Sequence, residues 1–125
     1  MNVAERAQDG YRKNAAYTKS PRDAEYEVIA RISHKLRSAA QSRATNYPRY
    51  VEALSDNRRL WTTLASDLAL PENGLPKDLR ARLFWLAEFT ESETQKLLRN
   101  EGDVGVLIEI NAAVLQGLRA QDRPQ

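Results

Sequence analysis

Apolar residues recur at helical spacing along most of the chain, and the clearest stripe surrounds a tryptophan. Four of them share one helical face, because three, four or seven residues separate them: Leu54, Trp61, Leu64 and Leu68. Asn57 and Arg58 interrupt this stripe, and polar residues there need partners in the core or a place at a contact surface. We expect this helix to follow the break at Asn46-Tyr47-Pro48 and to end at Pro71.

A second helix is predicted upstream, beginning at Ser20-Pro21-Arg22-Asp23. Ser20 is suited to capping, Pro21 fits the first turn, and Asp23 stands three residues after the cap, as in a capping box. One face of this helix is apolar and is formed by Ala24, Val28, Ile32, Leu36 and Ala39, with Ile29 beside them. The surrounding positions are strongly basic, and the helical pattern fades between residues 41 and 45.

A third helix is predicted from Pro76, which suits the first helical position. The pattern leaves open whether this helix continues beyond Thr90, but Asn100-Glu101-Gly102 stops any helix that reaches it. Its apolar side is formed by Leu79, Leu83 and Leu86, widened by Phe84 and Phe89. Trp85 lies away from the centre of that stripe, where it either covers a neighbouring helix or stays partly exposed.

The last predicted helix has Asp103 as its cap and is the most apolar of the four. Its stripe is formed by Val106, Leu107, Ile110, Val114, Leu115 and Leu118. We therefore expect this helix to be the central one, with Asn111 on or beside its buried face. Gly117 has two interpretations: it permits a close helix approach, or it begins the fraying end of the helix.

These patterns predict an all-α fold, a small single-domain helical bundle of about four to five helices. The chain has 125 residues, which is one domain by ordinary size, and no stretch requires a β-strand. We expect residues 1–19 to be a short N-terminal helix or a segment ordered by a partner. Residues 20–119 form the bundle, and residues 120–125 are expected to be a disordered tail.

Few residues in the chain offer chemistry. His34 is the only histidine and there is no cysteine, so thiolate metal sites and disulfides are excluded. Glu88 and Glu91 share a helix face, yet an exposed charged surface explains them more simply than acid–base catalysis does. We expect no catalytic site, no metal, no cofactor and no enzyme activity. The lack of cysteine, of a secretory signal and of any apolar run near ~20 residues favours a cytoplasmic protein without a membrane span.

Charge is unevenly distributed although the net charge is only +2. Residues 1–50 hold ten Lys and Arg against five Asp and Glu, whereas residues 51–125 hold nine against twelve. A basic half is able to attract nucleic acid, but a solvated helix surface is the more common origin of such asymmetry. The Arg58-Arg59 pair has the same two interpretations, phosphate contact or ion pairs within the bundle. No recognised nucleic-acid docking motif is present, so we do not expect nucleic acid as the partner.

Four short stretches occur in a fixed order between residues 11 and 119. They are Ser20-Pro21-Arg22-Asp23 preceded by Tyr17, Asn57-Arg58-Arg59-Leu60-Trp61-Thr62, Leu75-Pro76 followed by Leu79-Arg80-Ala81, and Leu107-Ile108-Glu109-Ile110-Asn111. In combination they resemble the FlaF family of flagellar biosynthesis proteins, which are small helical proteins. The run from Asn57 to Trp61 is the most specific of the four.

The resemblance implies a protein that binds flagellin as a secretion chaperone or adaptor and couples flagellin synthesis to export and filament assembly. It also implies a link to FlbT, a post-transcriptional regulator of flagellin. A nucleic-acid-binding regulator of flagellin expression is the alternative. The residues expected to contact a partner, flagellin through its terminal helices in particular, are Tyr17, Pro21, Arg22, Asn57, Arg58, Trp61, Arg80, Leu107 and Asn111. Trp61 and the stripe of Leu107 and Ile110 also have a second interpretation as plain core, which is the more common role of large apolar residues at helical spacing.

Overall fold

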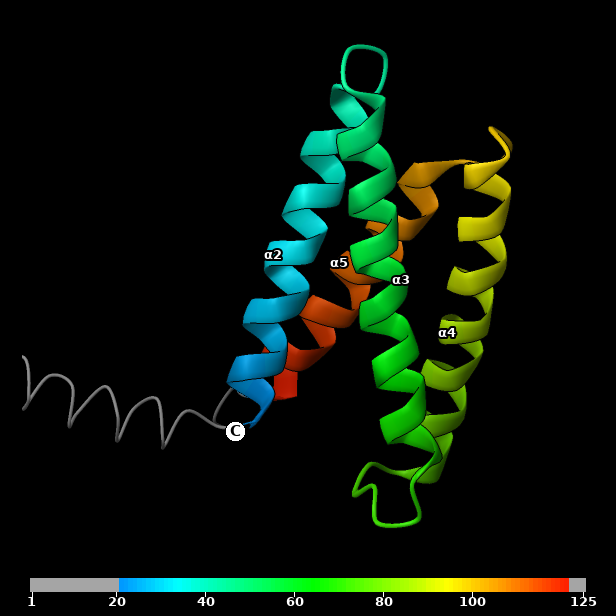
Figure 1. Ribbon diagram of the computed structural model, residues 1–125. Helices are drawn as coiled ribbons and strands as arrows, with labels where there is room; N and C mark the ends of the chain where they lie inside the picture. The colour runs from blue at the N-terminus through cyan, green and yellow to red at the C-terminus, as the bar shows by residue number, and fades with distance from the viewer. Residues whose placement is uncertain (1–20, 122–125) are drawn as a thin grey trace, which may run out of the picture.

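The computed structural model describes the backbone of residues 21–121 and the side chains of residues 25–119. This part of the chain consists of four α-helices and contains no strand, so the predicted all-α bundle is confirmed. The helices are α2 (Pro21–Gln41), α3 (Tyr47–Ala69), α4 (Lys77–Leu98) and α5 (Val104–Gln121) (Figure 1). The predicted segment 1–19 lies outside the described residues, and α5 extends two residues beyond the predicted boundary at 119.

Consecutive helices run in opposite directions and are joined by short connections (Figure 1). α3 packs beside α2 on one side and beside α4 on the other. α5 packs mainly along α2 and only briefly along α4, because it starts beside the end of α4 and crosses behind α3. The backbones of α3 and α5 have no close contact, so these two helices are diagonally opposite in the bundle.

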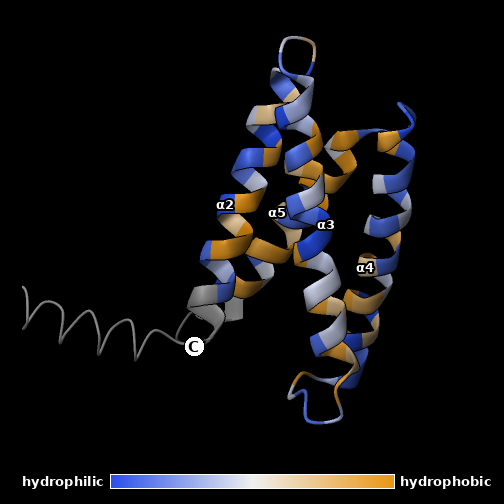
Figure 2. Ribbon diagram, in the orientation of Figure 1, coloured by the Kyte–Doolittle hydropathy of each residue, from blue (hydrophilic) through white to orange (hydrophobic). Residues whose placement is uncertain are grey.

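The main apolar core lies at the end of the bundle that carries the α2–α3 and α4–α5 connections (Figures 1 and 2). Side chains from all four helices meet there: Leu36, Ala39, Tyr50, Ala53, Leu54, Leu97 and Leu107. Burying one leucine-sized side chain stabilises a fold by about 1.5–3 kcal/mol. Arg43 covers this end, since its guanidinium lies 4.9 Å from the Tyr50 ring and donates to Oδ1 of Asn100 at 2.9 Å.

The starts of α3 and α5 and the end of α4 are satisfied by local hydrogen bonds. Asn46 caps α3 by accepting from the Arg49 amide, and Asp103 caps α5 as predicted by accepting from the Gly105 amide at 2.9 Å. α4 continues without interruption to Leu98, and Asn100 follows in the left-handed conformation at φ 62°. The amides of the two residues after the α4 C-cap return to α4 carbonyls at 3.0 and 2.8 Å, as in a Schellman motif.

The buried face of α2 differs from the predicted one. Ile29, Leu36 and Ala39 are buried, whereas Val28 remains 36% exposed. The position of Lys35 explains why Val28 is exposed. Nζ of Lys35 donates to Glu52 at 2.7 Å and to Asp56 at 2.8 Å, both on α3. These contacts raise the pKa of Lys35. With Lys35 turned toward α3, a residue seven positions earlier lies outside the core.

The prediction that α5 is the central helix was wrong. Only Leu107 and Asn111 are buried in it among the residues whose side chains are described. The other large apolar residues of α5 are half-buried: Val104, Val106, Ile108, Ile110, Val114, Leu115 and Leu118. Apolar composition indicated a buried helix, but α5 leaves α4 as it crosses toward α2, so part of its surface is left uncovered.

Candidate functional site

A chain of two hydrogen bonds crosses the bundle diagonally from α3 to α5. Nε1 of Trp61 donates to Oδ1 of Asn111 at 2.9 Å, and Nδ2 of Asn111 donates to Oδ1 of Asn57 at 2.7 Å. All three side chains are buried, with at most 3% of their surface exposed. Asn57, one of the two polar residues that interrupt the α3 stripe, therefore has a partner inside the core, and Asn111 of α5 is that partner.

This pair of hydrogen bonds holds the Trp61 side chain in one orientation inside the bundle. A buried indole N–H without an acceptor costs about 1–3 kcal/mol, and Asn111 removes that cost. Asn57 holds Asn111 in turn, although its own Nδ2 has no hydrogen-bond partner. Asn57, Trp61 and Asn111, all predicted to contact a partner, thus lie together in the interior.

An open groove runs between α3 and α4 on the outer side of Trp61. It has a volume of about 510 Å³ and is lined by Arg58, Trp61, Thr62, Ala65, Ala87, Glu88, Thr90 and Glu91. Ala65 and Ala87 have small side chains, so they leave space between α3 and α4 at their positions. The groove therefore joins apolar surface from both helices to a polar border.

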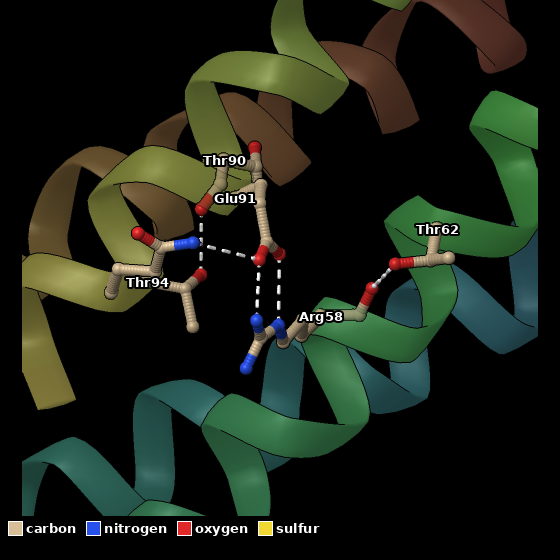
Figure 3. Close-up of polar contacts among 6 residues, drawn as sticks. Arg58, Thr62, Thr90, Glu91 and Thr94 are labelled. Carbon is tan, nitrogen blue, oxygen red and sulfur yellow. Dashed lines mark hydrogen bonds and ion pairs between the residues drawn. The ribbon is translucent and has the colours of Figure 1, made fainter.

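An ion pair forms part of that border (Figure 3). The Arg58 guanidinium binds both carboxylate oxygens of Glu91, with Nε donating to Oε2 at 2.8 Å and Nη2 to Oε1. The bidentate bond raises the pKa of Arg58 and lowers the pKa of Glu91, against the smaller opposing effect of burial. Gln95 donates to the same carboxylate at 3.2 Å, which holds it from the next turn of α4.

A buried hydroxyl lies in the same groove. Thr90 is 1% exposed, and its Oγ1 has no hydrogen-bond partner. Thr94 donates from its own hydroxyl to the Thr90 carbonyl at 2.6 Å, so the neighbouring threonine is satisfied by its helix (Figure 3). Thr90 Oγ1 is thus a polar atom without a hydrogen-bond partner, buried beneath the lining of the groove.

The remaining predicted contact residues are not gathered at the groove. Arg80 lies at the start of α4 and donates to the carbonyls of Leu68 and Leu70, at 2.8 and 3.1 Å, which closes the end of α3. Leu107 belongs to the main core. Pro21 and Arg22 lie in the first turn of α2, where side chains are not described, and Tyr17 lies outside the described residues.

Sequence reasoning did not identify the α4 side of the groove. Glu91 stood out only as a candidate partner of Glu88, and Ala65 and Ala87 gave no signal because alanine is common in helices. Arg58 gave the useful clue. The sequence allowed it either a phosphate contact or an ion pair within the bundle, and the structure shows the ion pair. Its partner is a glutamate 33 residues away, which spacing within one helix cannot reveal.

Four basic side chains of the described chain make contacts within the bundle. Lys35, Arg43, Arg58 and Arg80 all donate to side chains or carbonyls of other elements. Among the side chains of residues 25–119, no cluster of three or more His, Asp or Glu residues is placed to hold a metal ion. No helix in that range is long and apolar enough to cross a lipid bilayer.

Comparison with known proteins agrees with the four stretches that resemble FlaF. The family model described as "Flagellar protein FlaF" matches residues 7–118, which is most of the chain. No curated protein and no solved structure matches the chain. The match includes all four helices up to the last turn of α5 and the whole groove between α3 and α4. The chain belongs to the FlaF family of flagellar proteins.

Proposed function

We propose that this protein binds flagellin as a secretion chaperone or adaptor in the cytoplasm, and that it carries out no reaction. By binding flagellin it couples flagellin synthesis to export and filament assembly, with FlbT as a further partner. Membership of a flagellar family supports this direction. The observation that carries it is the open groove between α3 and α4, with its wall of Trp61, Ala65 and Ala87.

The groove has the features that an amphipathic helix requires of its binding surface. Apolar side chains spaced three and four residues apart on the bound helix need an apolar channel, and small residues let the two backbones approach. Ala65 and Ala87 supply these small residues on facing helices. The terminal helices of flagellin are amphipathic, so we propose that one of them lies along this groove before export.

The charged residues at the border of the groove fix the position of a bound helix along it. Arg58 and Glu91 are each more than a third exposed, so a bound helix reaches both charges without unfolding the bundle. A rigid wall lowers the entropy lost on binding, and the hydrogen bond from Trp61 to Asn111 provides that rigidity.

Co-purification with flagellin tests the function class. The wild-type chain, treated with nuclease, is expected to retain flagellin from the same genome, and the complex is expected to survive moderate salt. Recovery of flagellin message instead, with binding that weakens steeply as salt rises, would replace our proposal with the nucleic-acid-binding alternative. Recovery of neither flagellin nor RNA would refute both.

A further inference from the structure

We propose that the outer face of α4 is a self-association surface on which two copies of this chain pair about a two-fold axis. α4 lies at the edge of the bundle, and its outer side faces away from the other helices (Figure 1). This surface has none of the residues that line the groove, and Trp85 is about 120° around the helix from Glu91 and about 60° from Glu88, the groove residue nearest to it on the helix. The proposal stands whether or not flagellin is the partner of the groove.

The centre of the surface is an exposed pair of aromatic rings. Trp85 is 61% exposed, the most of any large apolar residue with a described side chain. Its ring stacks on Phe89, with centroids 5.5 Å apart and planes at 20°. Large exposed aromatic residues are the residues that most often anchor protein interfaces. Trp85 therefore has a contact partner within its own helix, and none of the four described helices covers it.

The residues around this pair have the spacing of a coiled-coil seam. Steps of four and three residues connect Asp78, Arg82, Trp85, Phe89, Ser92 and Lys96. Phe89 is half-buried, and the other five are exposed. A seam of this spacing follows one side of α4 for most of its length, and a helix of 22 residues is about 33 Å long.

The seam is complementary to itself only in the antiparallel orientation. When a second copy is placed antiparallel with its centre at Ala87, Trp85 lies opposite Phe89 of the second copy. Asp78 then lies opposite Lys96 of the second copy, so opposite charges meet at both ends. A parallel pair would instead place Asp78 against Asp78 and Lys96 against Lys96, which repel. An isologous dimer requires this kind of self-matching, and an unrelated partner would not.

Sedimentation equilibrium of the full chain tests the proposal over roughly 5–500 µM, the range expected for a small and partly polar interface. We expect a monomer–dimer equilibrium in the wild type. Trp85→Ala is expected to weaken the dimer by about tenfold or more. Phe84→Ala is the matched control, because Phe84 is a neighbouring exposed aromatic residue that lies outside the seam.

Exchanging the charges of Asp78 and Lys96 distinguishes a loss of association from a loss of folding, because only association can be restored by the second exchange. Asp78→Lys and Lys96→Asp are each expected to weaken the dimer. The double variant is expected to restore it, because the exchanged charges would again meet their opposites across the two-fold axis. Circular dichroism verifies that each variant is helical. A wild type that stays monomeric over the whole range, or a double variant no better than the two single ones, would overturn the proposal.

Discussion

Nε1 of Trp61 donates to Oδ1 of Asn111 across 2.9 Å, and this bond links two helices whose backbones have no close contact. α2 and α4 lie between α3 and α5, so the side chains alone connect this diagonal. A core built only from leucine would fill the same space without fixing how α3 and α5 face each other. The Trp61–Asn111 bond supplies that orientation, and the groove beside Trp61 depends on it.

Removing the acceptor should strongly destabilise the bundle. Asn111→Ala leaves the buried Trp61 N–H without an acceptor and Asn57 Oδ1 without its donor, so we expect a loss of about 2–4 kcal/mol in the free energy of unfolding. Urea unfolding followed by circular dichroism measures it. Gln116→Ala is the control, because it removes an exposed amide from the same helix and should change stability by less than about 0.5 kcal/mol.

A double-mutant cycle separates the hydrogen bond from packing. Asn111→Leu and Trp61→Phe should each be costly, whereas the combination should cost clearly less than their sum, because no polar group of this pair is then left unpaired. Strictly additive losses would mean that the bond does not couple α3 to α5.

Acidification should remove the contribution of the Arg58–Glu91 pair to the free energy of unfolding. Its bond to Arg58 lowers the pKa of Glu91 in the folded state below its ordinary value of 4.5. A lowered folded-state pKa gives stability that is present above the unfolded value and lost as the pH falls through the folded one. Both side chains are more than a third exposed, so the effect should stay below about 1 kcal/mol.

The measurement compares wild type with Glu91→Gln in urea at several pH values. The wild type should be the more stable above about pH 5, and the two curves should converge as the solution is acidified toward pH 3. A difference that is constant with pH would show that the carboxylate charge has no part in it.

Two glycines should respond in opposite directions to alanine. Gly117 is exposed within α5 and a Cβ there would meet nothing within 4 Å, so Gly117→Ala should stabilise the protein by about 0.5–1 kcal/mol. Gly102 has φ +81°, and its added Cβ would lie 2.5 Å from Oε1 of Glu93, which accepts the Asp103 amide. Gly102→Ala should therefore destabilise by about 1–3 kcal/mol. Thermal unfolding compares both, and the same sign for the two variants would contradict this explanation.

Helix positions were largely predictable from the sequence, whereas the contacts between helices were not. Pro48, Pro76 and Asp103 mark helix starts by local chemistry, and the structure places helices at each. Val28 and Ile29 are adjacent in sequence, and only packing against α3 and α5 decides which of them is buried. Periodicity gives a face to within about 100°, which is the uncertainty that misplaced Val28.

The candidate site was predicted in part for the same reason. Asn57 was correctly singled out as an interruption that needs a core partner or a contact surface, and its partner proved to be Asn111 on a distant helix. The groove depends on Ala65 and Ala87, whose importance comes from their small size on two helices that line the same space. A single sequence carries no signal for that relationship.

Titration calorimetry with purified monomeric flagellin tests the central claim most directly, using two variants of α3 that add the same charge. Ala65→Glu places a carboxylate on the apolar wall of the groove, whereas Thr63→Glu places one on an exposed position that does not line it. We predict that wild type and Thr63→Glu bind flagellin alike and that Ala65→Glu, while still folded, binds at least about tenfold more weakly. Equal binding by all three proteins would contradict the claim that the groove between α3 and α4 receives flagellin.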